Sequence, residues 1–172
     1  MHSQKYTITL FSSLAIGCNT VNEKEAGLVY ETTLEIFQQI HDDAVLVEDE
    51  TVELGLSSGP SWEGAVTISG SRTVNLEDII YPLSVSFIDV YAIDTDITLN
   101  GQVSFGMAVT PDQTDNLSYE SLINIDGEFE VEGDAKGIAE ILLTMTRAYD
   151  GGEDRYTTTL SGSIGGHSTD SL

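Results

Sequence analysis

Between Thr95 and Thr110 apolar and polar residues alternate with a period of two. From Ile97 to Val109 one parity holds large apolar residues and one glycine, Gly101, and from Asp96 to Ser104 the other parity holds polar residues. This pattern is typical of a long strand with one buried face and one solvated face. The alternating apolar set is Ile97, Leu99, Val103, Phe105, Met107 and Val109.

Five further segments show the same alternation, and short polar stretches separate them. The segments are 62–68, 83–87, 119–131, 139–145 and 156–164, and the stretches between them contain Gly, Asp, Asn or Pro. Short connections join antiparallel neighbours. We therefore expect a fold that is mainly β, with an antiparallel meander of six to seven strands.

Residues 25–42 have a different period. Ala26, Val29, Tyr30, Phe37 and Ile40 follow helical spacing, and Thr33 occupies the remaining position of the stripe. We expect a single N-terminal helix of about 16 residues here, with a strand over 28–37 as the alternative. One helix needs a surface on which to bury its stripe, so the expected architecture is a curved sheet packed against or wrapped round this helix.

A glycine recurs on the apolar parity of four expected strands. The repeat is apolar-x-Gly-x-(apolar), with Gly70, Gly101, Gly127 and Gly162 at its centres, and Arg72 interrupts the first copy. Glycine inside a strand often marks a bend or a close approach of another backbone segment. These positions favour curvature of the sheet, although Asp126-Gly127 is also a hairpin signal.

The N-terminus has the pattern of an export signal. An uncharged, mostly apolar run of 12 residues, 6–17, ends in Ala15-Ile16-Gly17, and Cys18 follows directly. The run is too short to span a bilayer and has the length of a signal-peptide core. We expect a signal peptide over 1–17, a lipidated Cys18 with a tether over 18–24, and a single β-rich domain over 25–172.

The segment Leu14-Ala15-Ile16-Gly17-Cys18 resembles the lipobox of bacterial lipoproteins, although Leu14 stands one place early and Ile16 occupies a position where small residues are common. The resemblance implies acyl groups on Cys18, anchorage to a membrane and location in the cell envelope, in the inner or outer membrane. Ordinary secretory cleavage after Gly17 is the alternative. The Gly-centred strands resemble those of uncharacterised bacterial lipoproteins, which implies no activity.

The charge of the chain limits its partners. Asp and Glu number 29 against 6 Lys and Arg, for a formal net charge of −23. Polyanions are bound by Lys and Arg, so we expect no nucleic-acid partner and no electrostatic attachment to an anionic membrane surface. One cysteine leaves no intramolecular disulfide and no cysteine-rich zinc module.

Two motifs suggest catalytic or metal chemistry. The segment 55–59 matches G-x-S-x-G with Ser57 as nucleophile, and His167 follows in chain order, but the strand-to-helix turn that this motif requires is not expected here. The acidic segments 94–96 and 150–154 place Asp94, Asp96, Asp150, Glu153 and Asp154 in turns, where calcium finds oxygen ligands, but neither has the spacing of a calcium loop.

Other titratable residues have simpler interpretations. Glu128, Glu130 and Glu132 share the solvated face of one expected strand, where a solubilising role fits better than paired acid–base chemistry. His41 near the helix end fits a partner of the helix dipole better than a metal ligand. We expect no cofactor.

The functional expectation is a non-enzymatic, lipid-anchored protein of the cell envelope that acts as a structural or interaction module. The alternative is a carrier of an apolar ligand or lipid, held on the apolar face of the curved sheet. A serine hydrolase is a distant third. The carrier would line its site with large apolar residues, which equally suit a packed core: Phe87, Phe105, Met107 and Phe129.

Overall fold

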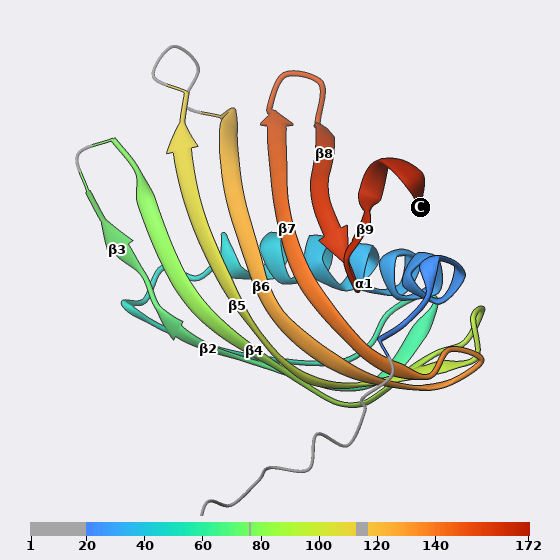
Figure 1. The fold of residues 1–172 in the computed structure, drawn as a ribbon. Helices are drawn as coiled ribbons and strands as arrows, with labels where there is room; N and C mark the ends of the chain where they lie inside the picture. The colour runs from blue at the N-terminus through green and yellow to red at the C-terminus, as the bar shows by residue number, and fades with distance from the viewer. Residues whose placement is uncertain (1–19, 76, 113–116) are drawn as a thin grey trace, which may run out of the picture.

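The computed structural model describes residues 20–75, 77–112 and 117–172, which form one helix and one sheet. The sheet curls round the helix, so that the helix lies in its concave side (Figure 1). Cys18 and the expected signal peptide lie outside the described residues. The elements are α1 (Glu23–Ala44), β1 (Thr51–Ser58), β2 (Trp62–Ser71), β3 (Thr73–Val74), β4 (Ile79–Ala92), β5 (Ile97–Pro111), β6 (Tyr119–Gly133), β7 (Gly137–Asp150), β8 (Arg155–Ile164), β9 (His167–Ser168) and a short 3-10 helix, η1 (Thr169–Ser171).

All strand pairs in the sheet are antiparallel, and the order is β1-β2-β4-β5-β6-β7-β8-β9, with β3 also paired to β4. The sheet is open, because β1 and β9 lie at its two edges. The prediction of a mainly β fold, with a curved antiparallel meander around one N-terminal helix, is confirmed. Seven strands are long, and β3 and β9 add two residues each.

The helix begins where its sequence supplies a start signal. Asn22 accepts a hydrogen bond from the backbone N–H of Glu25, and the Glu25 carboxylate accepts one from the backbone N–H of Asn22, which forms a capping box. α1 is therefore longer at both ends than the predicted 25–42, and the alternative of a strand over 28–37 is wrong. Thr33 is buried, as the stripe predicted, and its hydroxyl donates to the carbonyl of Val29.

The apolar face of the sheet packs against α1. Phe37 contacts Phe87 and Phe105, with ring centroids 6.2 and 6.1 Å apart, and Phe87 contacts Phe129 at 4.7 Å. These four rings are fully buried. The residues expected to line a ligand site on the concave face, Met107 included, therefore belong to the core.

The repeated glycines lie where neighbouring strands approach closely. A Cβ at Gly127 would collide with the carbonyl oxygen of Gln102, and one at Gly162 would collide with that of Leu142. Gly162 also has a φ of 132°, which other residues rarely adopt. Gly70 and Gly101 approach the adjacent strand in the same way. The close-approach prediction is confirmed, and Asp126-Gly127 lies within β6 instead of in a hairpin turn.

A bulge in β4 adds to the curvature. The register with β5 shifts between Phe87 and Val90, and Asp89 between them has a φ of 49°. The extra residue changes the parity of the buried positions, so that Phe87 and Val90 both face the helix. Strand β4 consequently remains in the sheet to Ala92, beyond the alternating segment that the sequence indicated.

Three boundaries differ from expectation. Strand β1, with Val52 buried, lies before the first of the expected strands and extends through Ser58. The C-terminal residues 165–172, which follow the last expected strand, form β9 and η1, and Gly165 donates to the carbonyl of Glu140 at 2.7 Å. Val21 is buried and bonds to Ile138, so residues 20–24 of the expected tether belong to the folded domain.

Candidate ligand-binding site

A hollow of about 580 Å³ lies where α1 ends and the long strands finish. Its walls come from the last turn of α1 and the chain after it, the start of β4, the end of β5, the start of β6 and the β7–β8 hairpin. These ends converge because adjacent antiparallel strands have nearly equal length. The lining residues are Asp42, Val45, Leu46, Ile79, Tyr81, Val109, Pro111, Leu117, Ser118, Tyr119, Tyr149 and Tyr156.

Three tyrosines form one wall of this hollow. The ring centroids of Tyr149 and Tyr156 are 4.8 Å apart, and those of Tyr119 and Tyr149 are 5.4 Å apart. The hydroxyls of Tyr119 and Tyr156 lie 2.8 Å from each other, and Tyr149 donates to the Asp154 carboxylate at 2.8 Å. The wall therefore presents aromatic surface while its hydroxyl groups are tied to fixed partners.

Two exposed leucines flank the same hollow. Leu46 is 77% exposed and Leu117 is 68% exposed, although both are large apolar residues. Leu46 follows the helix directly, and Leu117 precedes β6. Apolar side chains gathered at a concave surface are typical of a small-molecule site.

A buried polar network lies beneath the tyrosines. Arg147 donates to Asp42 through Nε and Nη2, at 3.1 and 2.7 Å, and its guanidinium carbon lies 4.1 Å from the centroid of the Tyr156 ring. His41, which is fully buried, places Nδ1 2.8 Å from Asp42 Oδ1 and Nε2 2.9 Å from the hydroxyl oxygen of Ser121. The network joins the last turn of α1 to β6 and β7.

The order Ser121–His41–Asp42 is that of a hydrolase triad, but its surroundings do not suit acyl transfer. The Ser121 side chain is fully buried, and β6 is paired along its length with β5 on one side and β7 on the other. A nucleophile in this position offers a substrate carbonyl neither access nor free backbone N–H donors of the kind that form an oxyanion hole. The geometry supports a structural role for the network.

Burial and nearby carboxylates perturb several groups around the hollow. Burial and the hydrogen bond to Tyr156 raise the pKa of Tyr119 well above its usual range. The hydrogen bond to Asp154 raises the pKa of Tyr149, and burial together with the charge of Asp42 raises the pKa of Asp43. In each case the environment disfavours an additional negative charge.

The residues of the G-x-S-x-G motif and its expected histidine do not come together in the sheet order. Ser57 is exposed on β1, at one edge of the sheet, and His167 lies on β9, at the other edge. β2 follows the motif, in place of the helix that a nucleophile elbow requires. The arrangement gives the hydrolase hypothesis no geometric support at Ser57.

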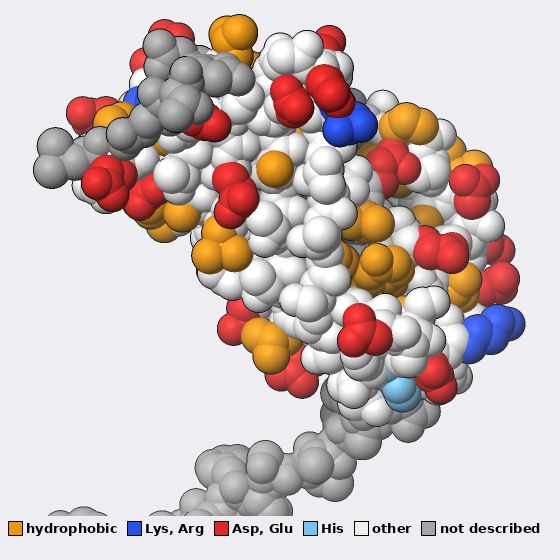
Figure 2. Space-filling view, turned by 90° about the horizontal axis from the view of Figure 1, so that it is seen from above, with side chains coloured by type: hydrophobic (Ala, Val, Ile, Leu, Met, Phe, Trp, Pro, Cys, Tyr) orange, Lys and Arg blue, Asp and Glu red, His pale blue; other side chains and the backbone are white. Residues whose placement is uncertain are grey.

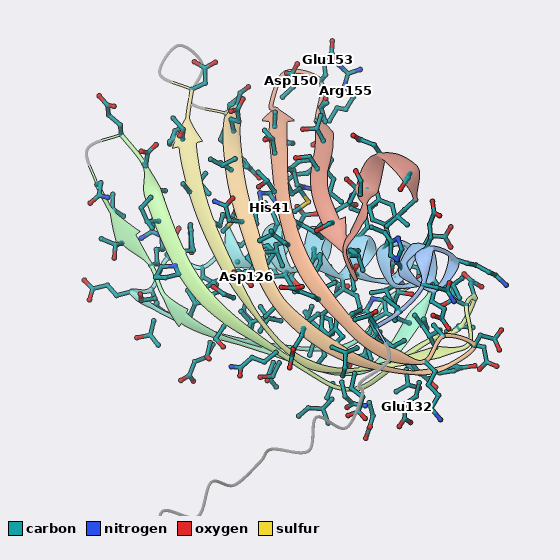
Figure 3. The ribbon with its side chains drawn as sticks, in the orientation of Figure 1. His41, Asp126, Glu132, Asp150, Glu153 and Arg155 are labelled. Atoms are coloured by element: carbon teal, nitrogen blue, oxygen red, sulfur yellow. The ribbon has the colours of Figure 1, made fainter. Side chains whose placement is uncertain are left out.

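The acidic turns use their carboxylates locally. Asp150 accepts hydrogen bonds from the backbone N–H groups of Gly152 and Glu153, at 2.9 and 3.1 Å, and Glu153 pairs with Arg155 at 2.8 Å. Figure 3 shows these residues together at the tip of the β7–β8 hairpin. Asp96 accepts from the Tyr91 hydroxyl at 2.9 Å, and Asp94 is exposed. Within residues 20–75, 77–112 and 117–172, no group of three or more His, Cys, Asp or Glu is placed to hold a metal ion.

The remaining candidates do not line the hollow. Glu128, Glu130 and Glu132 are exposed on the convex face of β6, as their parity predicted. His41 is in the last turn of α1, where the dipole interpretation placed it, and it also makes the buried contacts described above. The lipidation site Cys18 falls among the residues that are not described.

Sequence reasoning missed the tyrosine wall. Tyr119 follows the polar stretch 111–116, and Tyr149 and Tyr156 flank the stretch 150–154. Aromatic residues that flank two turns on the same side of a meander are brought together by antiparallel pairing, because Tyr119 is then opposite Tyr149, and Tyr149 is opposite Tyr156. The flanking positions are visible in the sequence, whereas the register that brings the rings together is not.

In the part of the chain that the structure describes, no helix has the length and apolar character needed to cross a membrane. Comparison with known proteins finds no family model, no curated protein and no solved structure that matches this chain.

Proposed function

We propose that this protein is a non-enzymatic, lipid-anchored module of the cell envelope that binds a small amphipathic molecule in the hollow at the end of its sheet. The observation that carries the binding function is the hollow itself, with its tyrosine wall and two flanking leucines. Its volume of about 580 Å³ falls within the range of about 300–1,000 Å³ that is typical of small-molecule sites.

The tyrosine-lined hollow has a more aromatic and aliphatic lining than three other hollows, all of them formed by described residues. A larger hollow of about 1010 Å³ follows residues 46–54, but carboxylates and other polar groups make up most of its lining. The hollow at residues 48–51 with 71–74 is more polar than apolar, and the one at the start of α1 is about equally polar and apolar. Apolar area buried by a ligand is the main source of affinity at such sites, so the tyrosine-lined hollow is the favoured one.

The position of the hollow relative to the expected anchor supports the same proposal. Thr20 and Val21 bond to Ile138 at the β6–β7 end of the sheet, whereas Tyr149 and Tyr156 lie at its opposite end. α1, with 22 residues, extends for about 33 Å between the tether and the hollow. An anchor on Cys18 would hold the first end near the membrane and leave the hollow open to the surrounding space.

The two other functional hypotheses have less support. The carrier that holds its ligand on the concave face requires space that Phe37 and its neighbours occupy. The hydrolase requires residues that lie at opposite edges of the sheet. The proposed site at the strand ends keeps the ligand-binding function of the carrier hypothesis, but it places the ligand outside the core.

Binding is tested with native mass spectrometry of the purified full chain, followed by calorimetric titration with amphiphiles of ten carbons. Leu46→Ser should weaken binding about tenfold, because it removes an exposed apolar wall of the hollow. The matched control is Leu142→Ser, which changes a leucine of 58% exposure on β7 outside the hollow. Equal affinities in the two variants would count against the site, and failure of all amphiphiles to bind would refute the binding function.

The anchor is tested separately with radiolabelled palmitate in cells. We expect label on the wild-type protein and none on Cys18→Ser, because the thiol is the expected attachment point. Equal labelling of both proteins would refute the anchor and leave the binding function unaffected.

A further inference from the structure

We infer that the amphiphile carries a cationic head group, with its apolar chain against the tyrosines and its head over the acidic strip at residues 48–53. This inference rests on the proposed function and goes beyond it by naming the chemical class of the ligand. The acidic strip consists of Glu48, Asp49, Glu50 and Glu53, which are all exposed.

The tyrosine-lined hollow and the acidic strip are adjacent. Leu46 lines the apolar hollow and also lines the larger hollow along residues 46–54, in which the four carboxylates lie. A molecule with an apolar chain in the first hollow therefore has its polar end next to the second. The shared wall at Leu46 gives an amphiphile one continuous place to lie.

Few cations are available at this end of the molecule, and those described are engaged. Arg147 is held by Asp42, and Arg155 is paired with Glu153. Arg72 is the cation nearest the strip, and it donates to the carbonyl of Glu48 and to the Tyr81 hydroxyl at 3.1 and 3.3 Å. One arginine beside four carboxylates leaves the strip negative.

Acidic side chains predominate over this whole face. Figure 2, viewed toward the ends of the long strands, shows acidic side chains spread over the surface and few lysines or arginines. The carboxylates at this end, besides the strip, include Asp43, Asp78, Glu120, Asp150 and Asp154. Together these carboxylates make the surface potential at this end of the molecule negative.

This potential decides among possible occupants of the apolar hollow. An anionic lipid or fatty acid would bring a like charge beside the strip, and a second copy of the chain would bring a further −23. A cationic amphiphile meets opposite charge at its head and apolar surface along its chain. Charge complementarity and apolar contact therefore favour the same ligand.

The experiment compares three probes with the same ten-carbon chain: decyltrimethylammonium, decyl glucoside and decanoate. Each is titrated into the purified full chain by calorimetry, below its micelle concentration, at low and high salt. We expect decyltrimethylammonium to bind about tenfold more tightly than decyl glucoside and decanoate to bind most weakly. Added salt should reduce these differences, because it shortens the Debye length from about 30 Å at 0.01 M to about 10 Å at 0.1 M and so weakens the attraction between exposed charges.

A pair of triple variants separates the strip from the general charge of the protein. Changing Glu48, Glu50 and Glu53 to Gln should lower the affinity for decyltrimethylammonium about tenfold and leave that for decyl glucoside unchanged. The matched control changes Glu128, Glu130 and Glu132 to Gln, which removes the same charge from the convex face. This control should change the affinities for both probes by less than about twofold, because those carboxylates are remote from the hollow and screened.

Other results of these titrations would contradict the cationic assignment, the binding function or both. Equal affinities for the three probes, tighter binding of decanoate, or equal effects of the two triple variants would overturn the cationic assignment while the binding function stands. No binding by any probe would refute the proposed function and this inference together. A dimer that light scattering detects in the wild type and that Leu46→Ser dissociates would assign the hollow to a second copy and overturn the inference.

Discussion

Arg147 holds Asp42 through two hydrogen bonds, Nε to Oδ1 at 3.1 Å and Nη2 to Oδ2 at 2.7 Å, and so fixes the end of α1 to β7. The arginine side chain is 7% exposed and the carboxylate is 39% exposed. The same carboxylate contacts the His41 ring. This pair of residues, 105 positions apart in the sequence, thus fixes the position of the helix end, which forms a wall of the hollow.

The first prediction concerns this pair. Asp42→Asn should lower the free energy of unfolding by about 2 kcal/mol, because it leaves a buried guanidinium without its counter-charge, and solvent at the exposed carboxylate limits the loss. Urea unfolding followed by circular dichroism measures it. Glu153→Gln breaks the exposed pair with Arg155 and should cost less than about 0.5 kcal/mol. Equal losses in the two variants would contradict the structural role of Asp42.

The second prediction concerns the curvature of the sheet. Gly127→Ala should destabilise the protein by about 1–3 kcal/mol, because the added methyl group meets the Gln102 carbonyl and the Val103 backbone of the paired strand. Gly55→Ala is the control, since a Cβ there meets nothing within 4 Å. The loss for Gly55→Ala should be below about 0.5 kcal/mol. Similar stabilities of the two variants would show that β5 and β6 do not approach as closely as described.

The sequence predicts most of this sheet because burial on one face imposes a period of two. Residues 97–109 show the period without interruption, and β5 follows them closely. Strand β1 was not predicted, although Val52, Leu54 and Leu56 alternate with other residues. Only Val52 of these three is buried, and the serines that follow them resemble a turn. The bulge at Asp89 was also missed, because it reverses the parity within β4.

The candidate site was less predictable than the fold. Its walls come from six segments between residues 42 and 156, and no local motif marks them. The pairing of Tyr119 with Tyr149 and of Tyr149 with Tyr156 follows once the register is known. The register depends on the lengths of the turns, which residue types alone do not fix. The buried link between His41 and Ser121, 80 residues apart, likewise requires the position of the helix in the sheet.

The third prediction concerns the pH dependence of stability through Asp43. Burial, with a smaller contribution from the charge of Asp42, raises the pKa of Asp43 in the folded state above its ordinary value of 3.8, so the unfolded state holds the negative charge more favourably than the folded state does. Below pH 3.8 the carboxyl is protonated in both states, and its stabilising effect on the folded state, relative to the ionised form, is fully present. This stabilisation is lost as the pH rises through the folded pKa. Asp43→Asn should therefore stabilise the protein at pH 7, and the gain should disappear near pH 3. A gain that persists at pH 3 would contradict the assignment, and urea midpoints across this range measure it.

The fourth prediction concerns the buried histidine. The ionised Asp42 carboxylate only accepts hydrogen bonds, so His41 Nδ1 donates to it, and in the neutral ring Nε2 accepts from the Ser121 hydroxyl. Ser121→Ala removes that donor and leaves Nε2 buried without a partner, which should cost about 1–3 kcal/mol of unfolding free energy. Thr144→Ala is the control, since it removes an exposed side-chain hydrogen bond to Asn124. A loss for Ser121→Ala no larger than for this control would show that the network does not hold the helix on the sheet, and the wall of the hollow at Asp42 would then need another support.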